Sequence, residues 1–90
     1  LTFERPDTDA FPCLRLAREA GAVGGTAPCV LNAANEIAVH AFLSGELSFP
    51  GIARVIESTL AELPARPVRH FSDLYAADGE AREVARGVAA

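Results

Sequence analysis

The sequence contains no methionine and no lysine, and it begins with Leu1. A newly made chain starts with methionine, and removal of that residue normally requires a small second residue, which leucine is not. We therefore expect this chain to be part of a larger polypeptide, cut at least on its N-terminal side. Any function inferred for it then belongs to the parent protein.

The small number of cysteines and the lack of a long apolar run exclude further classes of protein. Two cysteines, Cys13 and Cys29, are too few for a disulfide framework or a zinc site. We expect both to be reduced and buried as small apolar side chains. No apolar run reaches the roughly 20 residues that a membrane-spanning helix needs.

The charge pattern does not indicate nucleic-acid binding. The formal net charge is −4, and the eight positive charges, all arginines, are scattered rather than gathered in a basic stripe. Many arginines lie at helical spacing from a carboxylate, which predicts ion pairs on solvated helix faces. The expected pairs are Arg15 with Glu19, Arg54 with Glu57, and Arg86 with Glu83.

The length and composition fit one small domain. Half of the 90 residues are apolar, which is ordinary for a globular protein. A chain of this size buries roughly 60–65% of its extended surface on folding, enough for one modest core.

Apolar periodicity, interrupted by glycine and proline, predicts four helices. They are expected over residues 11–22, 27–44, 50–63 and 79–88, after an irregular segment over residues 1–10, with a short turn over residues 72–76. Polar side chains just before these segments are candidate N-caps, because they can accept from unpaired N–H groups of a first helical turn. The candidates are Asp9, Thr26, Ser72 and Asp78.

The helix expected over residues 27–44 is apolar nearly all round, which is typical of a helix buried on most sides. We take it as the central element. The sequence therefore predicts an all-α fold, a small bundle of about four helices around this central apolar helix, with no β-sheet.

Familiar catalytic and cofactor-binding motifs are missing. There is no GxGxxG, no GxxxxGK[ST] and no GxSxG, and the Gly24–Gly25 pair is interpreted as a helix stop. His40 follows Glu36 by four residues, a spacing that could hold a metal ion, but a surface or hydrogen-bonded histidine is the simpler interpretation. We expect no catalytic, cofactor-binding or metal-binding residue in this chain.

The unusual feature is a polar group inside the apolar helix, formed by Asn32, Asn35 and Glu36. Asparagine disfavours helix interiors because its amide competes for the backbone. At 100° per residue, the three side chains fall within one sector of about 100°. They could form a polar network that fixes packing within the domain or against a neighbour, contact a ligand directly, or simply be exposed.

An ordered set of motifs resembles the C-terminal helical domain of 1-deoxy-D-xylulose 5-phosphate reductoisomerases. The matching stretches are LTFERPD at residues 1–7, FPCLRLA at residues 11–17, LNAANE at residues 31–36, AFL at residues 41–43 and AREVA at residues 81–85. The family often has a polar cap and an acid where this chain has Pro50 and Gly51. The motifs cover nearly the whole chain in order.

The resemblance implies a function for the parent protein. Family members convert 1-deoxy-D-xylulose 5-phosphate to 2-C-methyl-D-erythritol 4-phosphate, in the non-mevalonate route to isoprenoids. They use NADPH and a bound Mg²⁺ or Mn²⁺, held by other domains, and the full enzyme is expected to be a cytoplasmic homodimer, or plastidic in a plant. This domain would support the catalytic domain of the same chain without supplying chemistry.

The resemblance also selects a role for Asn32, Asn35 and Glu36. We expect them to form an interdomain polar face at the seam with the catalytic domain. For the chain as a whole, the alternative to a domain of this enzyme is a free-standing helical protein-interaction module, which is a different class of protein. An upstream dinucleotide-binding glycine motif would distinguish the two.

Overall fold

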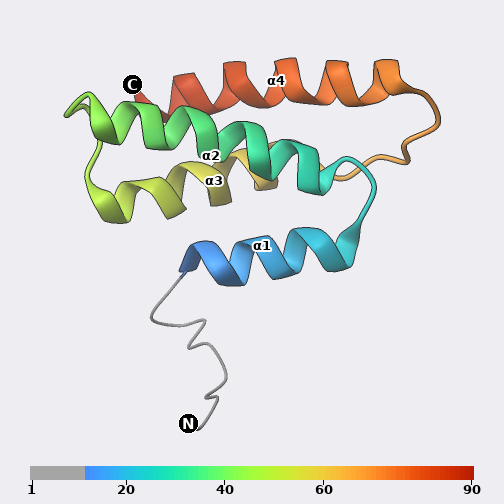
Figure 1. Ribbon diagram of the computed structural model, residues 1–90, viewed down its shortest axis with the longest axis horizontal. Coiled ribbons are helices and arrows are strands. Elements are labelled where there is room, and N and C mark those ends of the chain that lie inside the picture. Colours follow the sequence, from blue (N-terminus) through green and yellow to red (C-terminus); the bar gives the residue numbers. More distant parts are fainter. Residues whose placement is uncertain (1–11) are drawn as a thin grey trace, which may run out of the picture.

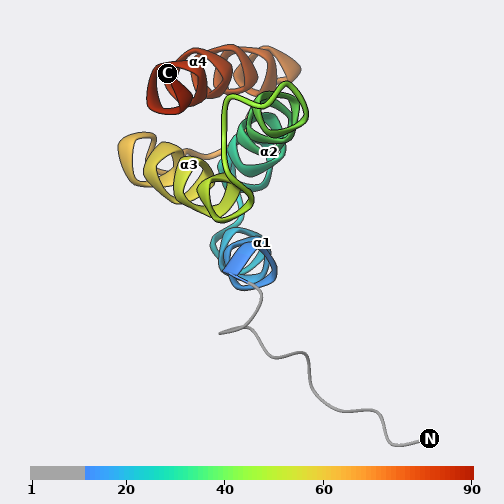
Figure 2. The same cartoon turned by 90° about the vertical axis from the view of Figure 1, so that its left-hand side faces the viewer.

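The computed structural model describes residues 12–90, which form four helices and, over that range, no strand. The helices are α1 (Pro12–Val23), α2 (Ala27–Leu43), α3 (Phe49–Glu62) and α4 (Phe71–Ala89). α2 and α3 pack against each other and against both remaining helices, whereas α1 and α4 lie on opposite sides of that pair (Figures 1 and 2). The predicted all-α bundle is confirmed. The segment over residues 1–10 and the Asp9 cap lie outside the described residues.

The central position of α2 follows from its small side chains. Most of its buried residues are alanines, and α4 buries alanines against it. Small side chains at a contact allow two helix axes to approach closely. The buried positions are Ala27, Val30, Ala33, Ala34, Ala38 and Ala41 on α2, and Ala81 and Ala85 on α4.

Larger side chains fill the remaining core from α1 and α3. Ile52, Val55 and Ile56 of α3 pack with Leu16 of α1 around the alanines of α2. The one fully buried polar side chain of α3, Thr59, donates its hydroxyl to the carbonyl of Val55 at 2.7 Å. Its hydrogen-bonding capacity is therefore met inside its own helix.

Glycine ends α2 as the sequence predicts. Gly45 has a φ of 78°, in the left-handed region that favours glycine. Its N–H donates to the carbonyl of Phe42 at 3.0 Å, and the N–H of Glu46 donates to the carbonyl of Ala41 at 2.9 Å. This pair of bonds is a Schellman motif, which satisfies carbonyls that the helix end leaves unpaired.

The start of α3 shows how Pro50 and Gly51 are accommodated. Ser48 is the N-cap, and its hydroxyl accepts from the N–H of Gly51 at 3.3 Å. Gly51 is buried, and a Cβ there would lie 2.7 Å from Cδ1 of Leu47. Glycine at this position therefore allows Leu47 to fold back over the first turn of α3.

The predicted division of the last helix is wrong. The sequence indicates a short turn over residues 72–76 and a separate helix over 79–88, but α4 runs unbroken over Phe71–Ala89. Ser72 and Asp78, both expected to be N-caps, lie inside it. The helix tolerates Gly79 because Ala81 and Ala85 are buried against the bundle, and tertiary packing overrides a weak local propensity.

The N-cap of α4 is His70, which forms a capping box with Asp73. One carboxylate oxygen of Asp73 accepts from the N–H of Arg69 at 2.9 Å and of His70 at 3.0 Å. These two bonds lower the pKa of the Asp73 carboxyl below its usual value, since they favour the charged form.

Two further predictions need correction. Both cysteines are free, but Cys13 is exposed and Cys29 is only half-buried, so neither is the fully buried side chain expected. The ion pair of Arg15 with Glu19 forms at 3.0 Å, but Glu57 lies 3.8 Å from Arg15 rather than pairing with Arg54. The ion pairs within residues 12–90 do not include Arg86 with Glu83.

Candidate functional site

The three polar residues predicted to share a face of α2 differ in their surroundings. Asn32 and Glu36 are exposed, one helical turn apart, and Asn35 is half-buried. The hydrogen bonds formed within residues 12–90 do not include either asparagine amide, whereas the Glu36 carboxylate accepts from the guanidinium of Arg82 on α4. Of the predicted group, Glu36 alone thus has a defined partner on another described helix.

Arg82 joins two helices through two carboxylates. Its Nε donates to Asp78 at 2.8 Å, one turn earlier on α4, and its Nη2 donates to Glu36 on α2. Both interactions favour the charged guanidinium and raise the pKa of Arg82 further above its usual value. The side chain of Arg82 is about 29% exposed, so this link lies at the border of the α2–α4 contact.

A second contact lies about two turns earlier between the same helices. The thiol of Cys29 on α2 donates to the carbonyl of Leu74 on α4 at 3.5 Å. Partial burial raises the pKa of the Cys29 thiol, Asp78 raises it further, and Arg82 opposes the shift. Together with the Glu36–Arg82 pair, this contact shows that α2 and α4 run side by side in the same direction, as Figure 1 shows.

Sequence reasoning missed two aromatic side chains on α4. Phe71 is 80% exposed and Tyr75 is 77% exposed. They are four residues apart, and Tyr75, Asp78 and Arg82 continue the same stripe at i+3 and i+7. The signal was present in the sequence as an i, i+4 aromatic pair, but the helix was expected to begin only at residue 79.

The turn between α1 and α2 is fastened to the connector between α3 and α4. The N–H of Thr26 donates to the carbonyl of Arg66 at 2.9 Å, and the N–H of Arg66 donates to the hydroxyl of Thr26 at 2.8 Å. Thr26 occupies the N-cap position of α2 as predicted, but its side chain bonds to Arg66 instead of capping the helix. Gly25, with a φ of 56°, allows this approach, because a Cβ there would lie 2.4 Å from the Arg66 carbonyl oxygen.

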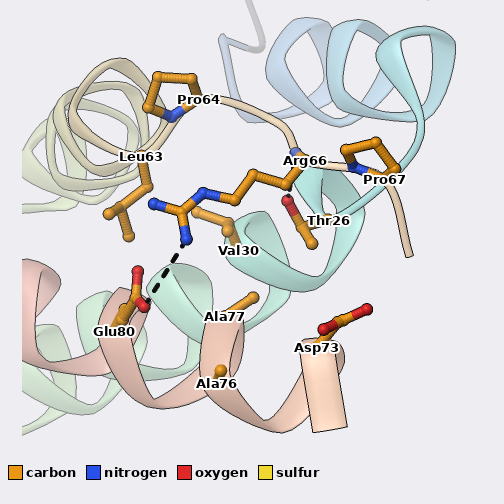
Figure 3. A pocket seen from close by; sticks show the side chains of 10 residues that line it. All are labelled: Thr26, Val30, Leu63, Pro64, Arg66, Pro67, Asp73, Ala76, Ala77 and Glu80. Carbon is orange, nitrogen blue, oxygen red and sulfur yellow. Dashed lines mark hydrogen bonds and ion pairs between the residues drawn. The ribbon is translucent and has the colours of Figure 1, made fainter. Parts of the chain in front are cut away.

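A small cavity lies beside this junction. Its volume is about 100 Å³, and Arg66 extends across it toward Glu80 of α4, 4.0 Å away (Figure 3). The lining residues are Thr26, Val30, Leu63, Pro64, Arg66, Pro67, Asp73, Ala76, Ala77 and Glu80. Ligand pockets usually measure roughly 300–1,000 Å³, so this cavity is too small for a nucleotide.

A second cavity, of about 310 Å³, lies between the C-terminal ends of α2 and α4, where His40, Glu46 and Arg86 line it. His40 is exposed, and its neighbour Glu36 pairs with Arg82. Residues 12–90 contain no cluster of three or more histidine, cysteine or acidic side chains placed to hold a metal ion. Over the same range, no helix has both the length and the apolar character needed to cross a membrane.

Comparisons with known proteins agree on one family. The sequence model of the family described as the DXP reductoisomerase C-terminal domain matches residues 1–84. The chain is 54% identical over 86 residues to the 1-deoxy-D-xylulose 5-phosphate reductoisomerase of Pseudomonas putida strain W619, and 55% identical over 85 residues to that of Ectopseudomonas mendocina. These matches cover 96% and 94% of this chain but 22% of each relative.

A solved structure gives the same result. The Zymomonas mobilis 1-deoxy-D-xylulose 5-phosphate reductoisomerase, in complex with NADPH, superimposes with a TM-score of 0.90 at 43% identity, over 98% of this chain and 23% of that one. The chain thus spans about a fifth of the length of the proteins it matches. It belongs to the family of DXP reductoisomerase C-terminal domains.

Proposed function

We propose that this chain forms the C-terminal domain of a 1-deoxy-D-xylulose 5-phosphate reductoisomerase. The complete enzyme converts 1-deoxy-D-xylulose 5-phosphate to 2-C-methyl-D-erythritol 4-phosphate with NADPH and Mg²⁺ or Mn²⁺, in the cytoplasm and as a homodimer. The observation that carries this proposal is the family match over residues 1–84. The matches of 54% and 55% identity to enzymes of that name support it.

The proposed role of this domain is to support the catalytic domain. We propose that other parts of the complete polypeptide hold NADPH and the metal ion, and the lack of a cluster of three or more metal-ligating side chains among residues 12–90 supports this proposal. No chemical step is therefore assigned to this chain. The alternative of a free-standing interaction module is disfavoured because the chain matches 22% of much longer relatives and the matching family is described as a C-terminal domain.

Expression of the complete polypeptide that carries this chain tests the proposal. It should oxidise NADPH only when 1-deoxy-D-xylulose 5-phosphate and a divalent cation are both present. The matched control is the same polypeptide shortened before residue 1 of this chain, which should lose most of that activity. A complete polypeptide without substrate-dependent NADPH oxidation would contradict the proposal, and full activity of the shortened form would contradict the supporting role.

We further propose that Asn32, Asn35 and Glu36 face the catalytic domain. Asn32 is exposed and Asn35 is half-buried, so both side-chain amides could form hydrogen bonds with backbone groups of a neighbouring domain. A buried amide that lacks such a partner costs about 1–3 kcal/mol. In the complete enzyme, Asn35→Ala should lower kcat/KM by about tenfold, which corresponds to about 1.4 kcal/mol. Glu62→Ala, on the exposed side of α3, is the control. Equal kinetics for the two variants would exclude a seam at Asn35.

A further inference from the structure

Five exposed or half-buried side chains lie on the neighbouring helices α2 and α4, and we call this set the aromatic–polar surface. They are Asn32 and Glu36 of α2, and Phe71, Tyr75 and Arg82 of α4. Glu36 and Arg82 are in contact, and Phe71, Tyr75 and Arg82 follow one another along α4 at helical spacing. Because the Cys29 thiol donates to the Leu74 carbonyl, the first turns of α4, which carry Phe71 and Tyr75, lie next to the first turn of α2.

Three of the five side chains, Phe71, Tyr75 and Arg82, are of types enriched at protein interfaces. Interfaces are enriched in phenylalanine, tyrosine and arginine, and the aromatic side chains commonly supply the largest share of binding energy. A buried phenylalanine or tyrosine covers 150–250 Å², yet Phe71 and Tyr75 are 80% and 77% exposed within residues 12–90. Arg82 is held in place by Asp78 and Glu36, so little side-chain freedom is lost when a partner covers it.

The length of the relatives indicates which part of the protein covers this surface. This chain corresponds to 22% of the two Pseudomonas-type relatives named above and matches a C-terminal domain, so by analogy most of the complete polypeptide precedes it. We propose that the aromatic–polar surface is the docking site for this preceding part of the same polypeptide, with Phe71 and Tyr75 as the aromatic anchors. This inference rests on the proposed function, and it adds α4 to the seam expected from α2 alone.

A second exposed apolar group, at the opposite end of α2, serves as the matched control. Leu43 is 80% exposed and Phe49 is 74% exposed. The ring of Phe49 already packs edge-to-face on Phe42, with ring centroids 5.7 Å apart. The ion pairs formed within residues 12–90 do not include any residue of the segment 43–49. Phe49 and Phe71 therefore have similar exposure in this domain but different predicted exposure in the complete protein.

Hydroxyl-radical footprinting of the wild-type complete polypeptide, read by mass spectrometry, tests the inference without any substitution. Oxidation rates of Phe71, Tyr75 and Phe49 are each normalised to the unfolded protein. Phe71 and Tyr75 should oxidise at least about tenfold more slowly than Phe49, since a covered ring reacts only when the interface opens. This protection should not change on dilution of the protein, because the docking is intramolecular.

Oxidation of Phe71 or Tyr75 at the rate of Phe49 would overturn the inference. Protection that disappears on dilution would also overturn it, because a second copy would then be the occupant. Reductoisomerase activity of the same sample is measured separately. Activity without protection refutes the docking site alone, whereas protection without activity refutes the proposed function and leaves the docking site standing.

Discussion

The two faces of α2 differ in what covers them. Its inner face carries Ala33, Ala34 and Ala38, which are fully buried by the other helices of the bundle. Its outer face carries Asn32 and Glu36, which are exposed within residues 12–90. The inner face is thus complete within this domain, whereas we propose that the rest of the polypeptide completes the outer face. Substitutions on the two faces should therefore have different consequences for the 90-residue chain.

The largest effect should come from enlarging a residue on the inner face. Ala38→Leu forces a larger side chain between Leu16, Ile52 and Ile56, and overpacking on this scale should lower the free energy of unfolding by about 3 kcal/mol. Asn32→Leu places the same side chain on the outer face and should change the free energy of unfolding by no more than about 0.5 kcal/mol. Urea denaturation measures both. Similar losses for the two variants would remove the distinction between the faces.

The next largest effect should appear at the junction beside the inner face. Gly25→Ala combines a left-handed φ of 56° with a Cβ 2.4 Å from the Arg66 carbonyl oxygen, and should cost about 2–3 kcal/mol. Gly24→Ala is the matched control, because its φ is 74° but no atom lies within 4 Å of the new Cβ, and should cost about 1–2 kcal/mol. Thermal and urea unfolding should rank the two variants in that order. The reverse order would show that the contact with Arg66 is not maintained.

A smaller effect is expected from the hydroxyl at the same junction. Thr26→Val leaves the N–H of Arg66 without its acceptor, and the part-buried bond should cost about 1–2 kcal/mol when one partner is lost. Thr26→Ser keeps the hydroxyl and should be clearly more stable than Thr26→Val. If serine is no better than valine in urea denaturation, the hydrogen bond contributes nothing measurable.

The smallest effect should come from the capping box at the exposed start of α4, near the outer surface. The pKa of Asp73 is lowered in the folded chain, so its carboxylate stabilises the fold above the unfolded aspartate pKa of about 3.9. That contribution is lost as the pH falls through the lower folded pKa. The urea midpoint of Asp73→Asn should therefore lie below that of the wild type at pH 7, and the difference should shrink as the pH falls below the unfolded aspartate pKa. A difference that stays constant with pH would show that charge is not the cause.

Periodicity and helix signals in the sequence located three of the four helices closely. The glycines at 24, 25 and 45 end α1 and α2 as expected, and the apolar stripe of α3 gives its position within a residue at each end. The prediction failed at α4, where Ser72, Asp78 and Gly79 resemble helix boundaries locally. Ala81 and Ala85 of α4 pack against residues of α2 that lie more than 40 positions earlier in the sequence. Such a long-range contact cannot be predicted from the residues around Gly79.

The sequence by itself determined the helical class, the family resemblance and the unusual polar group on α2. These depend on short-range patterns of side chains, which can be seen without knowing what each helix packs against. The tertiary structure decided which partners those residues have, Glu36 with Arg82 and Thr26 with Arg66, and it left Phe71 and Tyr75 exposed on α4. These relations arise only when the helices pack, because they depend on the direction and offset of α2 relative to α4 and to the α3–α4 connector.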